Sequence, residues 1–325
     1  MKYRNVGNSG LKISEISLGA WLTYGGALDL ARSRECITKA IELGVNFIDI
    51  ADVYAGGQAE AIVGRIIREE NYNRKDLVLS SKVFWPMSNN INDRGLSRKH
   101  IMESIEGTLK RLELEYLDIY FCHRYDPYTP LEEVVQAMSN LVNRGLIHYW
   151  GTSVWPAIQL ERAVWIARDM GDHPPVVEQP QYNMISRYIE LEVMETCKRN
   201  GLGITCFSPL SQGILTGKYN EGVPPESRGA TTDWLRWDLT TKNVEKVKKL
   251  VPIAESLGIT LSQLALAWIL RHEVISCAIT GATKPEHVET NVAASSIQLS
   301  NEVLKEIEEI LQNKPKLPGI YHPPW

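Results

Sequence analysis

The sequence of 325 residues lacks the features of membrane-spanning and disulfide-bonded proteins. It has no run of about 18 apolar residues, which is the length that a membrane-spanning helix needs. Its opening stretch, MKYRNVGNSG, has no apolar signal core, and no Asn-x-Ser/Thr acceptor occurs. The five cysteines show no CxxC pairing, so we expect reduced and mostly buried thiols at Cys36, Cys122, Cys197, Cys206 and Cys277. These absences predict a cytoplasmic protein without membrane insertion.

The sequence also lacks the common signatures of nucleic-acid, nucleotide and metal binding. The formal net charge is only -4, which argues against a nucleic-acid or anionic-membrane surface. The stretch after the first strand-like run, GAWLTYGG, does not match GxGxxG, and no Walker motif occurs, which disfavours a doubly wound dinucleotide fold. We find no HExxH and no His/Asp cluster with metal spacing, and we predict no metal site. A nucleotide, if bound, must be held in another way.

What the sequence does contain is a regular alternation of strand-like and helix-like segments. A short hairpin around residues 8–10 is followed by strand-like runs in ISEISLGA, VNFIDI, LVLSSK, YLDIYFC, IHYWGTS, VVEQ, ITCFSPL and SCAITGA. The helices of these units are expected at 31–43, 58–70, 97–112, 131–144, 158–168, 189–199, 242–257 and 285–294. Eight such units close a parallel barrel. We therefore predict the α/β class and a single (β/α)8 TIM barrel domain over residues 1–325, with additional helices at 261–271 and 301–311.

Four polar residues end three consecutive units or lie in the loops that follow them: Asp49, Tyr54, Lys82 and His123. The carboxyl ends of barrel strands meet at one mouth, where such barrels carry their active sites. A tyrosine with a pKa of about 10 needs one nearer 7 to donate protons readily, a difference of roughly 4 kcal/mol. One ammonium about 4 Å away supplies around that much at an effective dielectric near 20. We expect Lys82 to lower the pKa of Tyr54 and Asp49 to hold Lys82 in place. His123 then polarises a substrate carbonyl as a neutral imidazole.

Each of these residues has an ordinary structural interpretation when it is taken alone. A strand-end Asp is commonly a turn or cap residue, and a strand-end Lys is commonly a solvated charge. A single Tyr or His is more often packed or hydrogen-bonded than catalytic. Four such residues at the same end of three consecutive units are a far rarer coincidence. The set therefore favours a proton-donating site.

The same segments resemble the motifs of a known family. The chain resembles aldo-keto reductases over essentially its whole length. The segments that match the motifs of that family, in order, are NFIDIADVYAGGQAE, SSK, YFCHRYDPYTPLEE, WGTS, EQPQYNMI, FSPLSQGILTGKY and GATKPEHVETN. The resemblance is closest to the branch that contains the beta subunits of voltage-gated potassium channels and their microbial relatives. It implies a (β/α)8 barrel that reduces aldehydes and ketones with NADPH, and its catalytic residues fall on Asp49, Tyr54, Lys82 and His123. The channel subunits carry Asn at the position of His123, so the histidine favours real catalysis.

The resemblance also implies a binding site for NADPH, which we expect in preference to NADH. Ser153 and Gln179 match residues that hydrogen-bond the nicotinamide carboxamide. Phe207 stands where relatives have an aromatic residue that stacks on the nicotinamide ring. His287 stands where relatives often have Gln or Arg, and Thr290 where many have Glu. The further cofactor residues that the resemblance implies are Trp21, Ser208, Pro209, Leu210, Gly213, Lys218, Arg228, Gly281, Thr283, Lys284 and Asn291.

The substrate side of the mouth is expected to contain Tyr24, Trp85 and Arg124, together with Trp21. The predicted function is NADPH-dependent reduction of an aldehyde or ketone to an alcohol, with Tyr54 as general acid and a small carbonyl compound as substrate. The alternative is a redox-sensing binding protein of the channel beta-subunit kind, with slow catalysis. A barrel hydrolase or lyase would need paired carboxylates or metal ligands, which we do not find. The resemblance leaves both a monomer and a homo-tetramer open.

Overall fold

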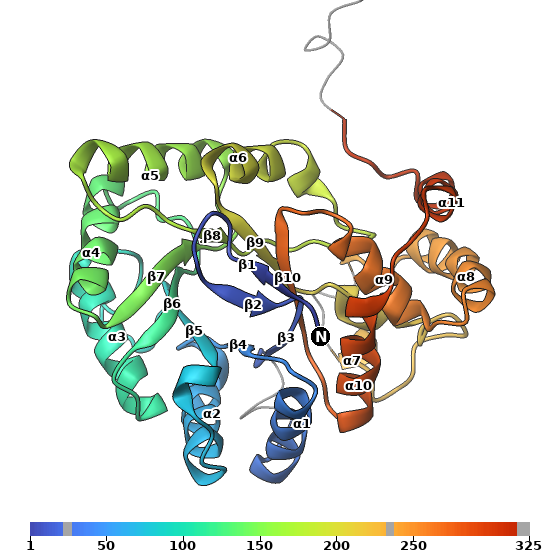
Figure 1. Cartoon of the computed structure of the whole chain (residues 1–325), viewed down its shortest axis with the longest axis horizontal. Coiled ribbons are helices and arrows are strands. Elements are labelled where there is room, and N and C mark those ends of the chain that lie inside the picture. The colour runs from blue at the N-terminus through green and yellow to red at the C-terminus, as the bar shows by residue number, and fades with distance from the viewer. Residues whose placement is uncertain (22–27, 232–236, 317–325) are drawn as a thin grey trace, which may run out of the picture.

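Eight parallel strands form a closed barrel with helices around it in the computed structural model (Figure 1). The structure describes residues 1–21, 28–231 and 237–316 of the chain. The order of strands around the barrel is β10-β3-β4-β5-β6-β7-β8-β9, so consecutive strands pair and the last closes on the first. The strands are β3 (Ile16–Gly19), β4 (Phe47–Asp49), β5 (Val78–Val83), β6 (Leu117–Cys122), β7 (Ile147–Thr152), β8 (Val177–Glu178), β9 (Gly203–Cys206) and β10 (Ile275–Thr280). This confirms the predicted (β/α)8 barrel.

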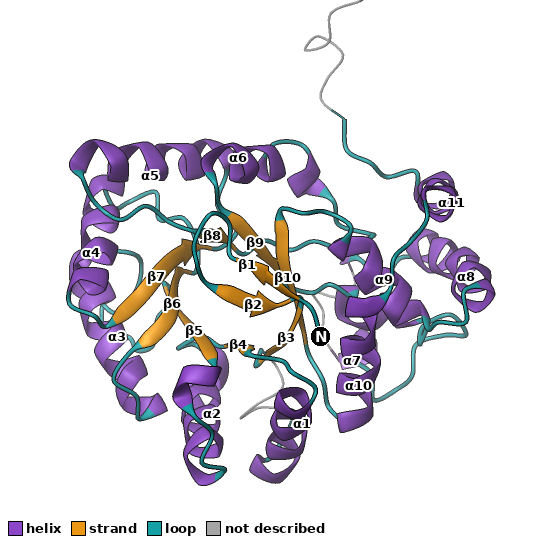
Figure 2. Ribbon diagram, viewed as in Figure 1, coloured by secondary structure: helices purple, strands orange, loops and turns teal. Residues whose placement is uncertain are grey.

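The helices form an outer ring and bury the outer face of the strands (Figure 2). Every residue of β5, β6 and β10 is buried, which is why these strands appear in the sequence as continuous apolar runs. The helices are α1 (Leu30–Glu42), α2 (Gln58–Glu69), α3 (Arg98–Leu112), α4 (Leu131–Asn143), α5 (Ala157–Met170), α6 (Val193–Asn200), α7 (Arg228–Thr231), α8 (Thr241–Ser256), α9 (Leu261–Leu270), α10 (Pro285–Ala293) and α11 (Asn301–Leu311).

The seventh unit differs from the sequence prediction, because the barrel helix and the additional helix exchange roles. α9, predicted as the additional helix, packs against β10 and α10, and all its residues from 264 to 270 are buried. α8 buries only one face and packs on α9 and α11, so α8 and α11 lie outside the barrel (Figure 1). A second difference is the start of α6, which begins at Val193 instead of 189, because Tyr188–Glu190 form a separate 3-10 turn.

The predicted N-terminal hairpin closes one end of the barrel. β1 (Tyr3–Asn5) pairs antiparallel with β2 (Lys12–Ser14), and Val6 and Ile13 pack on the residues that open β4, β5 and β8. Gly7 has φ +55°, and a Cβ there would lie 2.3 Å from a backbone oxygen of the turn before β9. Only glycine permits this close approach. The open mouth is therefore at the carboxyl ends of the strands.

Two long loops leave that mouth. Residues 84–94, after β5, contain no helix or strand. The loop that starts at 208, after β9, contains a 3-10 segment, Ser211–Thr216, and the short helix α7.

All five cysteines are buried, and none forms a disulfide. No single described helix is long and apolar enough to cross a membrane, and α8 and α9 meet the length and composition criteria only together, as a pair bent by 90°.

Candidate active site

A cavity of about 780 Å³ opens at the carboxyl ends of the strands. Its volume lies in the range of small-molecule and cofactor sites. Most residues predicted for the site line it: Trp21, Asp49, Tyr54, Trp85, His123, Arg124, Ser153, Gln179, Phe207, Ser208, Pro209, Leu210, Gly213, Lys218, Arg228, Gly281, Thr283, His287 and Asn291. Lys82 lies beneath the lining, and Lys284 is exposed away from it. Tyr24 lies outside the described residues.

A buried ion pair forms the floor of this site. Lys82, on β5, is 0% exposed, and its Nζ donates to Asp49 Oδ2 at 2.6 Å and to the carbonyl oxygen of Ile50 at 2.6 Å. The other carboxylate oxygen of Asp49 accepts hydrogen bonds from Ser80 Oγ at 2.7 Å and Gln179 Nε2 at 2.9 Å. Burial lowers the pKa of Lys82, and the Asp49 carboxylate opposes that change. Adjacent strands thus hold two charges in one orientation, with five hydrogen-bonded groups joined around them: Lys82, Asp49, Ser80, Gln179 and the Ile50 carbonyl.

Tyr54 packs against this ion pair and opens a strained turn. The Nζ of Lys82 lies 4.9 Å from the centre of the Tyr54 ring. The 3-10 turn Tyr54–Gly57 includes Ala55 at φ 49°, a left-handed conformation that is uncommon outside glycine. Such strain is common at functional sites, where the surrounding structure enforces it.

The protonation of Tyr54 differs from the sequence-based expectation. Burial raises the pKa of Tyr54 well above its ordinary value, and the Asp49 carboxylate raises it further, while the Arg124 guanidinium opposes both. The expectation that Lys82 brings this pKa near 7 is therefore wrong for this structure. The physical reason is that the phenol is desolvated, and that the charge of Lys82 is balanced by Asp49 at 2.6 Å.

His123 follows β6 and is held neutral, as predicted. Burial lowers the pKa of His123 well below its ordinary value, and the charges of Lys82 and Arg124 lower it further. The ring of His123 meets Tyr54 edge to face at 5.9 Å between centres and Trp85 at 6.3 Å. Its buried Nδ1 has no hydrogen-bond partner among the described residues. Other atoms of His123 line the cavity, so the imidazole borders a ligand bound there.

Ser153 and Gln179 are held in place by hydrogen bonds. Ser153 Oγ donates to the carbonyl oxygen of Gln179 at 2.8 Å, and the side chain of Gln179 donates to Asp49. Below them the buried Glu178 accepts hydrogen bonds from the Thr152 hydroxyl and from the backbone N–H of Trp155 at 3.2 Å. The short segment after β7 is therefore rigid where it meets the cavity.

The loop after β9 has the geometry of an anion site. Ser208, Gln212 and Gly213 all have positive φ, between 50° and 102°, a backbone form that turns N–H groups toward a common point. A Cβ on Gly213 would meet the Cε and Nζ of Lys218 at 2.5 and 2.7 Å, so the ammonium lies directly over the loop. Gln212 Oε1 is buried with no partner among the described residues. Arg228 also lines the cavity, and burial lowers its pKa. The two cations and the left-handed loop fit a bound group with two negative charges, whereas the Gln212 oxygen can only accept a hydrogen bond from a donor.

The far end of the cavity is formed by α10 and the segment before it. Thr283 Oγ1 and His287 Nδ1 are 3.4 Å apart, and Asn291 is 4% exposed. Thr290 lines the cavity, but its hydroxyl donates to the carbonyl oxygen of Glu286 at 2.9 Å. Lys284, which the resemblance implies as a cofactor residue, precedes α10, is exposed and is not among the residues that line the cavity.

Sequence reasoning missed part of the lining. The missed residues are Gly19, Val53, Gln212, Thr216, Ser262, Ile279, Thr280 and Thr290. Gln212 and Thr216 lie inside the segment FSPLSQGILTGKY, and the resemblance of that segment to the family could have identified them as lining residues. Ser262 opens α9 and was missed because that helix was taken as an addition to the barrel.

The fold and the mouth place this chain among the (β/α)8-barrel proteins with a cluster of titratable groups at the carboxyl ends of the strands. Within that class, the chain belongs to the aldo/keto reductase family of NAD(P)-dependent oxidoreductases, whose profile matches residues 15–312. Two similar proteins carry the description "probable voltage-gated potassium channel subunit beta". The one from Arabidopsis thaliana is 44% identical over 329 residues, covering 99% of this chain and 100% of the relative. The one from Oryza sativa subsp. japonica is 43% identical over 328 residues, with the same coverage.

Proposed function

We propose that this protein reduces aldehydes or ketones to alcohols with NADPH, and that Tyr54 is the general acid. The observation that carries the proposal is the buried Lys82–Asp49 ion pair packed against Tyr54, with a neutral His123 beside them at the cavity. Membership of an oxidoreductase family supports it.

The four residues have distinct roles in this proposal. The bound cofactor supplies the hydride. His123 donates a hydrogen bond from its neutral imidazole to the carbonyl oxygen, which polarises the carbonyl. Tyr54 stays protonated because its pKa is raised, and it gives its proton to that oxygen as the alcohol forms. Lys82 packs its ammonium against the Tyr54 ring and positions the phenol, and Asp49 fixes the position of Lys82.

The cofactor is proposed to extend from the catalytic residues to α10. Ser153 and Gln179 would bind the carboxamide of the nicotinamide, with Phe207 against the ring. Lys218 and Arg228 would bind the pyrophosphate, since both line the cavity beside the left-handed loop. We propose NADPH over NADH.

A second candidate function follows from the relatives that carry a channel-subunit name. In that case the barrel is a redox-sensing binding protein with slow catalysis. His123 favours the enzyme, because an imidazole at the mouth serves carbonyl polarisation directly.

One measurement separates these candidates, and a second tests the cofactor. Stopped-flow oxidation of NADPH with a panel of aldehydes is expected to give brisk turnover, whereas slow turnover with every aldehyde would favour the binding protein. Titration with NADPH and with NADH, followed by protein fluorescence, is expected to show tighter binding of NADPH. Failure of both nucleotides to bind would contradict the proposal.

A further inference from the structure

Arg124 is a half-buried cation at the mouth with no acidic partner among the described residues. It follows His123 after β6 and lines the cavity. Its Nη1 donates to the carbonyl oxygen of His123 and lies 3.4 Å from Ser153 Oγ. No hydrogen bond from its Nε or Nη2 is found in the described part of the chain. Most of the guanidinium fork is thus unused.

Other arginines of comparable burial are paired with a carboxylate. Arg187 pairs with Glu190 at 2.8 Å, and Arg74 pairs with Asp118 at 2.6 Å. Burial lowers the pKa of Arg124, and the charge of Glu178, which forms no ion pair with it, opposes that change. Arg228, which also lacks a carboxylate partner within the described residues, is the cation that we assign to the cofactor phosphates. An unpaired guanidinium in a cavity is likewise suited to a ligand anion, since its fork matches two carboxylate oxygens.

The surroundings of Arg124 place such an anion close to the reacting carbonyl. The guanidinium carbon lies 5.6 Å from the centre of the Trp85 ring, and the same ring meets His123 edge to face. The charge of Arg124 also opposes the rise in the pKa of Tyr54. The cation therefore borders the space between the phenol, the imidazole and the indole, where the proposed carbonyl would bind.

The charge of the site favours a carboxylate over a phosphate ester. One guanidinium balances the single charge of a carboxylate, whereas a phosphate dianion would need a second cation. The neighbouring ammonium of Lys82 is already paired with Asp49 and is 0% exposed. Trp85 is 38% exposed and offers an apolar face to a short carbon chain.

We propose that Arg124 binds a carboxylate of the substrate, so that the preferred substrates are oxo acids in which a short carbon chain separates the carbonyl from the carboxylate. This inference rests on the proposed carbonyl reduction and names its substrate class. The reaction converts the oxo acid to the hydroxy acid: hydride adds to the carbonyl carbon, the proton of Tyr54 adds to the oxygen, and the carboxylate is unchanged.

The test compares succinic semialdehyde with its neutral ester, methyl 4-oxobutanoate. Wild type is expected to prefer the acid by roughly tenfold to a hundredfold in kcat/KM, mainly through KM, because hydrogen bonds to charged groups are strong. Arg124→Met is expected to bring that ratio near one, and Arg124→Lys to restore part of it. Arg94→Met is the matched control, because Arg94 is exposed, lies outside the cavity lining and carries the same charge. That variant should keep the wild-type ratio.

Two outcomes would overturn the inference: a wild-type enzyme that does not prefer the acid, or an Arg124→Met variant that keeps the preference. Both leave carbonyl reduction itself intact. If neither compound is reduced, the proposed function fails. The role of Arg124 is then tested by ligand binding alone. Butanoate is then titrated against butanamide on the NADP⁺-loaded protein by calorimetry. Arg124→Met should weaken butanoate about tenfold or more and leave butanamide unchanged, and equal binding of both compounds by wild type would contradict the role of Arg124.

Discussion

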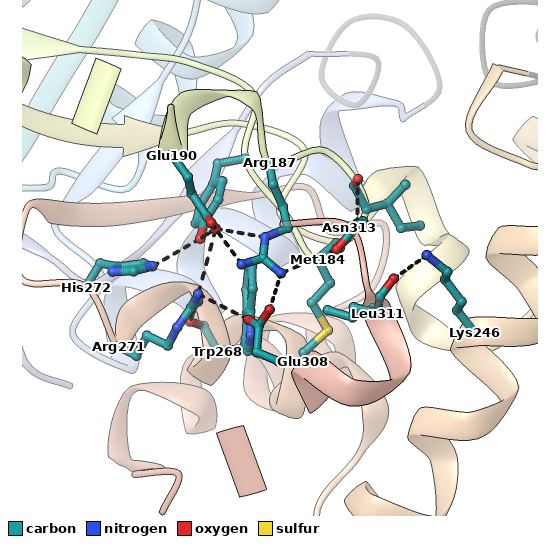
Figure 3. Close-up of polar contacts among 12 residues, drawn as sticks. Met184, Arg187, Glu190, Lys246, Trp268, Arg271, His272, Glu308, Leu311 and Asn313 are labelled. Carbon is teal, nitrogen blue, oxygen red and sulfur yellow. Dashed lines mark hydrogen bonds and ion pairs between the residues drawn. The ribbon is translucent and has the colours of Figure 1, made fainter. Parts of the chain in front are cut away.

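The ion pair at the barrel mouth and a second charged cluster, between the 3-10 turn before α6, α9 and α11, both join basic to acidic side chains with low exposure. In the second cluster, Arg187 donates to both carboxylate oxygens of Glu190, at 2.9 and 2.8 Å, and to Glu308 at 2.7 Å (Figure 3). Arg271 stacks on Trp268, with its guanidinium carbon 3.6 Å from the ring centre. Each of these charges thus meets an opposite charge or an aromatic face.

The second cluster performs a structural task. Glu308 belongs to α11, so its ion pair with Arg187 fastens this outer helix to the barrel. Asn313, just after α11, donates to the carbonyl oxygen of Met184 at 2.9 Å (Figure 3). No group in this cluster lines the cavity.

The mouth differs from the second cluster in where its polar groups without a protein partner lie. Its ion pair is as short, at 2.6 Å, but Nδ1 of His123 has no partner and Arg124 has no carboxylate within the described residues. Both residues face a cavity, together with Tyr54. Trp268 Nε1 in the second cluster is also buried without a partner among the described residues, so an unpaired polar atom does not by itself identify a site. The comparison teaches that unpaired groups indicate a functional site where they also belong to residues that line a cavity.

The largest expected effect comes from removing one hydroxyl in each region. Tyr54→Phe should lower turnover by about 10²–10⁴-fold, because the acid is lost, and should leave NADPH affinity nearly unchanged. Tyr182→Phe is the matched control: its hydroxyl donates to Glu190 at 2.6 Å, so we expect a loss of about 1 kcal/mol in unfolding free energy and normal turnover. Steady-state kinetics and urea unfolding measure both. Near-normal turnover of Tyr54→Phe would remove Tyr54 from the acid role.

Neutralising one carboxylate in each region separates stability from activity. Asp49→Asn leaves the buried Lys82 without its counter-charge and should cost about 3 kcal/mol of unfolding free energy. Glu190→Gln should cost less, because Arg187 keeps its ion pair with Glu308. Only Asp49→Asn should also reduce the turnover of the folded protein, because Lys82 is released from its position. Urea unfolding and kcat per folded molecule are the measurements. Equal loss of turnover in both variants would mean that the regions do not differ in function.

The two regions should also respond to pH with opposite sign. Burial raises the pKa of Glu178, beneath the mouth, to about 7 from 4.5, so the folded state holds a proton that the unfolded state has lost between these values. Stability from this group therefore falls as pH rises, by about 2 kcal/mol between pH 5 and pH 6.5. Glu178→Gln should abolish that fall, as measured by urea unfolding at the two pH values.

Glu190 supplies the opposite case. Burial would raise its pKa, but the hydrogen bonds from Arg187 and Tyr182 lower it overall, so its contribution is present above pH 4.5 and is lost as pH falls. Glu190→Gln should therefore cost less stability at pH 3.5 than at pH 6.

A Glu178→Gln variant whose stability keeps the wild-type dependence on pH would show that Glu178, beneath the mouth, holds no such proton.

The smallest effect is expected outside the lining. Lys284→Ala should change the KM for NADPH less than about threefold, because Lys284, unlike Lys218, does not line the cavity. Lys218→Ala should raise it about tenfold, since its ammonium lies over the left-handed loop. A large effect of Lys284→Ala would place this lysine on the cofactor after all. Steady-state kinetics at saturating aldehyde measure both variants.

Much of the fold and of the site could be predicted from the sequence. The strand-helix period fixed the number of units, and polar residues after β4, β5 and β6 had to meet at one mouth because parallel strands align their carboxyl ends. The exchange of α8 and α9 could not be predicted in the same way. A helix with one apolar face, such as α8, resembles a barrel helix, whereas α9 is apolar all round because the barrel covers one side and α8 the other.

Electrostatics was the part that the sequence could not supply. The pKa of Tyr54 depends on its desolvation and on the partner of Lys82, and both are properties of the folded chain. The exposure of Lys284 and the missing partner of Arg124 are likewise invisible in the sequence, because they depend on which side of a loop faces the cavity.

The central claim is that the mouth directs a hydride to a carbonyl carbon beside Tyr54. The most direct test is reduction of an aldehyde with NADPH that carries deuterium at the transferable position, followed by mass spectrometry of the alcohol. The account predicts one deuterium at the carbinol carbon with wild type and almost no labelled alcohol with Tyr54→Phe. Alcohol without deuterium, or equal labelling by both proteins, would contradict it.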